Sequence, residues 1–333
     1  MQAAIYGLAG ASLGADERAF FRDSDPAGYI LFRRNCIDRA QLRALTDDLR
    51  ALSGRDDLPI LIDQEGGRVA RLGRPEWPAF PAGGRFAELY AKAPMSAIEA
   101  ARANAQAIAL LLGEAGVTVD CLPVLDVRQE EASDIIGDRA LGAEPMQVAA
   151  LGRAMLDGLK AGGAVGVVKH MPGHGRARVD SHKLLPLVDA PEEALERDLE
   201  PFRTLRNAPM GMVAHIVFTV WDRDNPSSLS PFVIGEIIRG GIGFDGFLMT
   251  DDLGMHALSG DFAERTRRAL AAGCDAALHC SGVMEEMVAV ASAAGTLGEK
   301  GRERLARAMA WAGPGTGTYE ALVETRDRLL ALA

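Results

Sequence analysis

The chain has 333 residues, of which 48% are hydrophobic and 25% charged, an ordinary globular composition that excludes disordered and fibrous classes. Its 46 acidic and 36 basic residues give a formal net charge of −10, which disfavours nucleic acid as a partner because phosphate groups would be repelled. All apolar stretches are far shorter than the roughly 20 residues of a transmembrane helix, so no membrane span is expected.

Two further features favour a cytoplasmic protein. The apolar N-terminal segment, residues 1–14, has no basic residue before Arg18, whereas a signal peptide normally begins with a charged region. The four cysteines match no C-x-x-C spacing, so we expect no disulfide framework and a reducing compartment.

Eight short apolar runs predict β-strands. Several contain no alternating polar residues, which is typical of parallel strands that are covered on both faces. In chain order the runs are residues 3–9, 28–32, 59–63, 117–127, 164–171, 211–218, 246–252 and 275–280.

Helical patterns lie between these runs. They cover residues 38–52, 96–112, 145–160, 191–206, 231–239, 262–272 and 283–294. In the first, Leu42, Leu45 and Leu49 share one face. In the second, Ser96 is expected to cap the helix, with Glu99 completing a capping box.

The alternation of strand and helix predicts an α/β fold, a closed (β/α)8 TIM barrel, with an open doubly wound sheet as the alternative. Such a barrel takes about 250 residues. We therefore assign the additional length to long loops after the strands, and interpret residues 1–333 as a single domain.

Polar side chains gather directly after the predicted strands, where a barrel places its active site. The segments are Asp63-Gln64-Glu65-Gly66-Gly67-Arg68 with Arg71, Asp126, Gly137-Asp138-Arg139, Lys169-His170-Met171-Pro172-Gly173-His174-Gly175, Asp180-Ser181-His182, His215, Thr250-Asp251-Asp252 and His279. Carboxylates beside Lys, Arg and His suit a neutral polyhydroxylated ligand, because charged groups bind hydroxyls through strong hydrogen bonds.

No cofactor or metal is predicted. His170 and His174 have the spacing of a helical zinc motif, but Pro172 and Gly173 exclude a helix there. The chain contains neither a phosphate-binding loop motif nor a dinucleotide fingerprint.

Cleavage of a glycosidic bond would need one group at the anomeric carbon and another that protonates the leaving oxygen. Asp251, at the end of an apolar strand, is the candidate nucleophile. Strand alternation would turn Asp252 the other way, so a structural hydrogen-bonding role is favoured for it. His182 is the candidate acid, because Asp180 two residues earlier would orient the ring and favour its protonated form.

Four segments together resemble family 3 glycoside hydrolases, and more narrowly their bacterial β-N-acetylglucosaminidase branch. They are Asp63-Gln64-Glu65-Gly66-Gly67-Arg68-Val69, Lys169-His170-Met171-Pro172-Gly173-His174-Gly175, Asp180-Ser181-His182 and Thr250-Asp251-Asp252-Leu253-Gly254-Met255. The similarity extends over most of the chain with the motifs in the family's order. Met171 stands where Phe is usual, and Thr250 where Ser is common.

The resemblance implies a retaining mechanism with a covalent glycosyl-enzyme on Asp251 and acid/base catalysis by His182 paired with Asp180. It also implies that sugar hydroxyls are held by Asp63, Arg71, Arg139, Lys169 and His170. The implied substrates are small carbohydrates, namely muropeptides that carry a non-reducing N-acetylglucosamine, in cytosolic peptidoglycan recycling. The oligomeric state is left open, with a monomer favoured.

Two alternatives remain at this point. In the first, the substrate's acetamido oxygen attacks the anomeric carbon while Asp251 and Asp252 support it. In the second, the chain is a sugar-binding barrel without catalytic activity.

Overall fold

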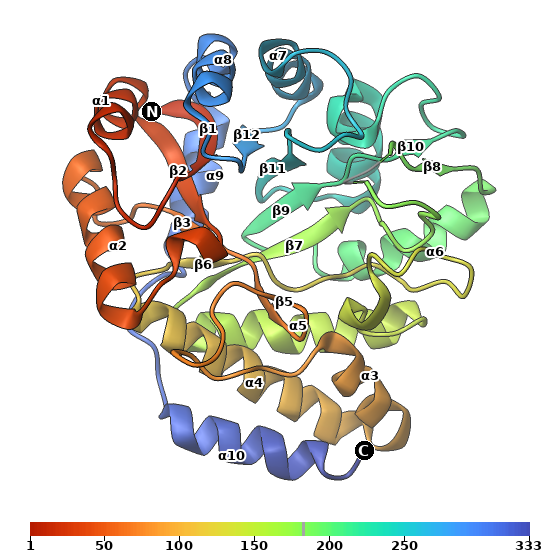
Figure 1. Cartoon of the computed structure of the whole chain (residues 1–333). Coiled ribbons are helices and arrows are strands. Elements are labelled where there is room, and N and C mark those ends of the chain that lie inside the picture. The colour runs from red at the N-terminus through yellow and green to blue at the C-terminus, as the bar shows by residue number, and fades with distance from the viewer. Residues whose placement is uncertain (182–183) are drawn as a thin grey trace.

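Eight parallel strands close into a barrel, as the sequence predicts (Figure 1). The computed structural model describes residues 1–181 and 184–333. The barrel strands are β1 (Gln2–Gly7), β2 (Pro26–Leu31), β3 (Ile60–Ile62), β6 (Val119–Asp120), β7 (Val165–Met171), β9 (Met210–Val213), β11 (Phe247–Asp252) and β12 (Ala276–His279). Each pairs with its neighbours in chain order, and β1 pairs with β12 to close the ring.

The barrel interior is filled by alternate residues of the strands. Ile5, Leu61, Val167, Met212 and Met249 belong to one buried cluster inside the ring. The intervening side chains point outward and join a second cluster with the surrounding helices. This double coverage explains why the strands read as continuous apolar runs in the sequence.

Helices surround the barrel, and all seven predicted helical segments are present. The helices are α1 (Ala15–Ser24), α2 (Arg39–Ser53), α3 (Gly83–Lys92), α4 (Pro94–Glu114), α5 (Pro145–Ala161), α6 (Glu192–Thr204), the π-helix η4 (Val233–Ile242), α7 (Phe262–Ala272), α8 (Met284–Ala294), α9 (Glu299–Met309) and α10 (Tyr319–Leu330). Helices α1, α3, α9 and α10 were not predicted from the sequence. The chain length beyond a minimal barrel is therefore taken up by additional helices as well as by loops.

The predicted cap of α4 is wrong. The helix begins two residues before Ser96, at Pro94, and its N-cap residue is Ala93, which makes no side-chain cap. Proline is pre-organised for the first turn of a helix, so it moves the start upstream of the serine. In contrast, Asp38 caps α2 by accepting a hydrogen bond from the Gln41 amide at 2.8 Å.

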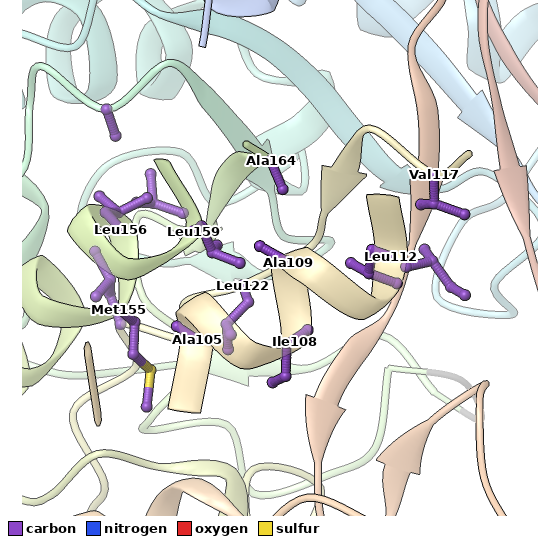
Figure 2. Packing of buried hydrophobic residues seen from close by; sticks show 14 of the residues in the cluster. Ala105, Ile108, Ala109, Leu112, Val117, Leu122, Met155, Leu156, Leu159 and Ala164 are labelled. Atoms are coloured by element: carbon purple, nitrogen blue, oxygen red, sulfur yellow. The ribbon is translucent and has the colours of Figure 1, made fainter. Parts of the chain in front are cut away.

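Small residues allow α4 and α5 to pack closely against each other and against the strands. A Cβ at Gly158 of α5 would lie 2.2 Å from the carbonyl oxygen of Arg102 in α4, so only glycine fits there. Figure 2 shows Ala105 and Ala109 of α4 in the same apolar cluster as Leu156 of α5. The last helix, α10, lies along the outer side of α4 (Figure 1).

The carboxyl ends of the strands carry short additional elements. An antiparallel pair, β4 (Gln64–Gly66) and β5 (Val69–Ala70), follows β3 directly. A second small pair, β8 (Leu187–Val188) and β10 (Val217–Phe218), joins the segments after β7 and β9. Within the described ranges, no helix combines the length and apolar character that crossing a membrane would require.

Candidate active site

A cavity of about 240 Å³ opens at the carboxyl ends of the barrel strands. Its polar lining includes Asp63, Glu65, Arg68, Arg71, Arg139, Lys169, His170, His174, Ser181, Asp251 and Asp252. Apolar side chains, among them Ile30, Phe32 and Met212, complete it. The structure therefore brings together Asp251 and all five residues predicted to hold sugar hydroxyls.

Lys169 joins two carboxylates at the base of this cavity. Its Nζ lies 2.8 Å from Asp63 Oδ1 and 2.6 Å from Glu65 Oε1. Arg71 donates from Nη2 to the other Asp63 oxygen at 2.8 Å. The lysine extends from inside β7, and both carboxylates follow β3, so the bridge crosses from one part of the barrel to another.

These contacts keep the groups ionised although they are buried. Burial alone would raise the pKa of Asp63, but Lys169 and Arg71 hold it well below its ordinary value. Burial likewise opposes ionisation of Glu65, but Lys169 and Arg139 lower its pKa to about 2. Burial disfavours the charged form of Lys169, yet Asp63 and Glu65 raise its pKa above the usual range. The cluster thus presents fixed charges around neutral pH.

Two arginines clamp the loops that follow β3 and β6. Arg139 binds Glu65 in a bidentate pair, with both N···O distances 2.8 Å, and donates to the carbonyl oxygen of Ile135 at 3.0 Å. Arg68, from the turn between β4 and β5, donates from Nε to Asp138 Oδ1 at 2.8 Å. We call Asp63, Glu65, Arg71, Arg139 and Lys169 the charged wall.

Glu65 lies within one of the polar segments after the predicted strands, but no role was predicted for it. Its position two residues after Asp63, in a β-segment with period two, was the available signal that both carboxylates could face the cavity. Its pairing with Arg139, 74 positions later, depends on how two long loops meet.

Asp126 holds the loop that follows β7. Its Oδ2 lies 2.7 Å from His170 Nδ1, while its Oδ1 accepts from the backbone amides of His170 at 3.2 Å and His174 at 2.6 Å. Against the opposing effect of burial, the His170 interaction lowers the pKa of Asp126 to about 2. An ionised Asp126 accepts a hydrogen bond from Nδ1–H, and the other ring nitrogen, Nε2, lies 3.4 Å from Arg139 Nη2.

His174 belongs to the same loop and is nearly inaccessible to solvent. Burial lowers the pKa of His174 to about 4, so the ring is neutral near pH 7. Its Nε2 lies 3.4 Å from Ser181 Oγ. The following Gly175 packs on the segment after β6, where a Cβ would come 1.9 Å from the carbonyl oxygen of Val127.

The two aspartates that end β11 have different partners. Asp251 Oδ1 accepts from the Asp252 amide at 2.8 Å. Asp252 Oδ1 accepts from the amides of Gly254 at 2.9 Å and Cys280 at 3.1 Å, which fits the expected hydrogen-bonding role. Asp252 nevertheless also lines the cavity. The β11–β12 register shifts between Met249 and Asp252, so regular alternation does not extend to this point.

The predicted acid/base lies outside the described residues, because His182 and the following Lys183 are not among them. Asp180 is described, and its carbonyl oxygen accepts from the Leu184 amide at 3.0 Å. Ser181, beside His182 in the chain, lines the cavity. Across residues 1–181 and 184–333, no group of three or more His, Cys, Asp or Glu is arranged to hold a metal ion.

A closed barrel with carboxylates and fixed cations around a cavity at its carboxyl end has the arrangement of a (β/α)8-barrel enzyme whose site suits a polyhydroxylated ligand. Comparison with known proteins agrees. The model of the glycosyl hydrolase family 3 N-terminal domain matches residues 7–309. A β-hexosaminidase of Alkalilimnicola ehrlichii is 40% identical over 282 residues, which are 83% of this chain and 80% of that protein.

Solved structures are similar over the whole barrel. Native NagZ from Neisseria gonorrhoeae has a TM-score of 0.85 at 30% identity, covering 99% of this chain and 96% of that one. The same organism's NagZ in complex with N-trifluoroacetyl-D-glucosamine has a TM-score of 0.86 at 29% identity, covering 100% and 98%. This chain belongs to glycosyl hydrolase family 3 and is a glycoside hydrolase, so the expected fold and family are both confirmed.

Proposed function

We propose that the chain is a retaining, exo-acting β-N-acetylglucosaminidase that removes non-reducing terminal N-acetylglucosamine from muropeptides, including 1,6-anhydro-muramyl peptides. Its curated relatives are named β-hexosaminidases, and a related solved structure holds an N-acylated glucosamine derivative. Both observations support a hexosamine with an acylated nitrogen as the sugar that enters the cavity.

One observation carries this proposal: Asp251 lines the same cavity as the charged wall. Asp251 would attack the anomeric carbon and form a covalent glycosyl-enzyme, which water then hydrolyses with retention of configuration. Asp63 would accept hydrogen bonds from sugar hydroxyls, while Arg71 and Lys169 would donate to them.

The remaining polar groups would hold the sugar from the side of the β6 and β7 loops. His170 and Arg139 both line the cavity, and Asp126 fixes the orientation of the His170 ring. A ring held by an ionised carboxylate offers one defined nitrogen to a ligand hydroxyl. Arg139, already bound to Glu65, would orient that nitrogen and contribute a positive charge.

His182, with Asp180, would protonate the leaving oxygen and then activate water. This role is supported by the cavity contact of the adjacent Ser181 and by the pKa of an imidazole, which lies close to neutral pH. For substrate-assisted cleavage, Asp252 would have to support the acetamido group. Its Oδ1 already accepts from the Gly254 and Cys280 amides, which restricts the orientation of the carboxylate and favours the covalent route.

A trapping experiment tests the proposal directly. A 2-deoxy-2-fluoro glycosyl inactivator should label Asp251, with the adduct located by peptide mass spectrometry. The enzyme should also cleave an N-acetylglucosaminyl reporter faster than the corresponding N-acetylgalactosaminyl and glucosyl reporters. A fully active enzyme that carries no adduct on Asp251 would contradict the covalent mechanism, and preference for the glucosyl reporter would contradict the substrate assignment.

We further propose that the enzyme acts in the cytoplasm as a monomer in peptidoglycan recycling. The chain's relatives and its acidic composition are compatible with this setting. Cell fractionation tests the location. Light scattering after size exclusion tests the oligomeric state, and a dimer mass at micromolar concentration would contradict the monomer.

A further inference from the structure

His215 is a fully buried histidine that the proposed mechanism does not use. It follows β9, and its two ring nitrogens face different segments of the chain. Nδ1 lies 2.6 Å from Ser228 Oγ, and Nε2 lies 3.0 Å from the backbone carbonyl oxygen of Asp252. The imidazole therefore bridges the segment around Ser228 and the end of β11.

The partners determine where the ring carries its proton. A carbonyl oxygen can only accept, so the hydrogen between His215 and Asp252 must be on Nε2. The Ser228 hydroxyl then donates to Nδ1. Burial lowers the pKa of His215, so the ring is neutral near pH 7 and this pattern of donors and acceptors persists.

Ser228 is itself held in place by its surroundings. It lies in a short 3-10 turn, Ser227–Leu229, in which the preceding Ser227 donates from Oγ and from its amide to the Ile216 carbonyl oxygen, both at 2.8 Å. The turn is thus tied to the residue that follows His215. Ser228 can orient the imidazole because its own position is fixed by backbone contacts.

The Asp252 backbone is fixed through three elements. Its carbonyl accepts from His215 after β9 and from the Met255 amide, at 3.1 Å, in the following turn. Its carboxylate accepts from the Cys280 amide after β12 and from the Gly254 amide. Its own amide donates to Asp251 Oδ1 at 2.8 Å. Because strand pairing shifts register before Asp252, these hydrogen bonds take over the support that a regular ladder would give.

We propose that His215 is a positioning residue for the nucleophile: by holding the Asp252 carbonyl, it helps to fix the backbone of Asp252, the residue whose amide orients the Asp251 carboxylate. This inference rests on the proposed role of Asp251. His215 acts through Asp252 and not on the sugar. Its loss should therefore reduce kcat and leave KM nearly unchanged, because the charged wall that would bind the sugar lies across the cavity on other strands.

The expected effects separate positioning from general packing. His215→Ala should lower kcat by about 100-fold, the scale of an ångström-level misplacement of a reacting group. KM should change by less than ~3-fold, since the hydroxyl contacts are retained. The loss of kcat should be equal for activated and unactivated aglycones, because both kinds of substrate react through the same attack by the nucleophile. His215→Gln, whose amide nitrogen can replace Nε2 as the donor, should recover most of the activity.

Two serine variants form a matched pair for the case in which His215→Ala does not fold. Ser228→Ala removes the hydroxyl that orients the imidazole, and should lower kcat by about 5- to 10-fold, the scale of one neutral hydrogen bond. Ser227→Ala removes a neighbouring buried hydroxyl that donates only to backbone, and should lower the thermal midpoint without a comparable loss of kcat.

The deciding measurement is the rate at which the 2-fluoro inactivator labels Asp251 in the wild type and in each variant. Slower labelling in His215→Ala and Ser228→Ala, with His215→Gln and Ser227→Ala close to the wild type, supports the inference. Labelling at the wild-type rate in His215→Ala overturns it while leaving the proposed nucleophile intact. Absence of label on Asp251 in the active wild type overturns the proposed function and this inference together.

Discussion

The two sides of the cavity hold their carboxylates in different ways. On the side of β3, β6 and β7, Asp63 and Glu65 are neutralised by side-chain cations at 2.6 to 2.8 Å. On the side of β9, β11 and β12, Asp251 and Asp252 accept from backbone amides. Ion pairs saturate the charge of the first pair, whereas backbone amides orient the second pair. The first arrangement suits binding, and the second suits a group that must attack a carbon atom.

The largest effect should follow from removing the proposed nucleophile. Asp251→Ala should lower kcat by on the order of 10⁴-fold, the scale of losing a member of a catalytic unit. Its thermal unfolding midpoint should stay near that of the wild type. Steady-state turnover of an N-acetylglucosaminyl reporter measures this effect. Retention of more than a few per cent of wild-type activity would assign the attack to another group.

His182→Ala should be the next largest, and its size should depend on the leaving group. General acid catalysis typically contributes 10²- to 10⁴-fold, so unactivated aglycones should lose about that much. A nitrophenyl-type aglycone needs no proton and should lose far less in the glycosylation step. The ratio of the two losses is the measurement. Equal losses on both kinds of substrate would show that His182 is not the acid.

Lys169→Met tests the charge balance of the wall. Two buried carboxylates would lose their shared cation, at a cost of about 3–5 kcal/mol at pH 7. In the wild type, the depressed pKa values of Asp63 and Glu65 mean that their contribution is present above the ordinary carboxyl pKa and is lost as the pH falls. In the variant these carboxyls should protonate more readily, so its deficit should shrink between pH 7 and pH 4.

Urea unfolding at several pH values measures that deficit. Lys160→Met is a suitable control, because this exposed lysine lies over the Trp311 ring at 4.5 Å and does not line the cavity. A variant at position 169 that loses no more stability than this control would show that the bridge is energetically unimportant.

Asp120→Asn should give the smallest effect, and it should raise the stability where Lys169→Met lowers it. Asp120 is fully buried in β6 and accepts from the Gln64 amide at 3.0 Å, and burial raises its pKa to about 7. A raised pKa adds stability below the ordinary Asp pKa of about 4, and this stability is lost as the pH rises through about 7. Asparagine keeps a hydrogen-bond acceptor and does not ionise. The stability of the variant relative to the wild type should therefore increase from pH 4 to pH 8.

Thermal unfolding across this pH range measures the gain. Asp57→Asn, at an exposed position, provides the matched control and should show no such trend. A difference between Asp120→Asn and the wild type that does not vary with pH would contradict a buried, protonated carboxyl in β6.

The barrel could be predicted from the sequence because apolar runs and helical patterns alternate, and several of the runs are continuously apolar, as strands buried on both faces are. The position of the active site could be predicted from the same pattern, because the catalytic residues of such barrels lie at the carboxyl ends of the strands. Helices α1, α3, α9 and α10 were missed although the structure contains them. The start of α4 was misplaced because Ser96 and Glu99 matched a capping pattern three residues into a helix that Pro94 begins.

Site contacts that depend on tertiary structure could not be predicted in this way. The pairing of Glu65 with Arg139 and the link from His215 to Ser228 join residues whose separation in sequence carries no regular signal. Asp126 was predicted to end a strand, but β6 already ends at Asp120. The three bonds of Asp126 to His170 and His174 depend on the folded path of this loop.

The bridge made by Lys169 has a consequence for how activity responds to acidity. Asp63 and Glu65 stay ionised far below neutral pH, and Lys169 keeps its proton above it. Changes of protonation within the wall therefore do not alter the activity near neutral pH. A rate-versus-pH plot should accordingly take its shape from ionisable groups outside the wall.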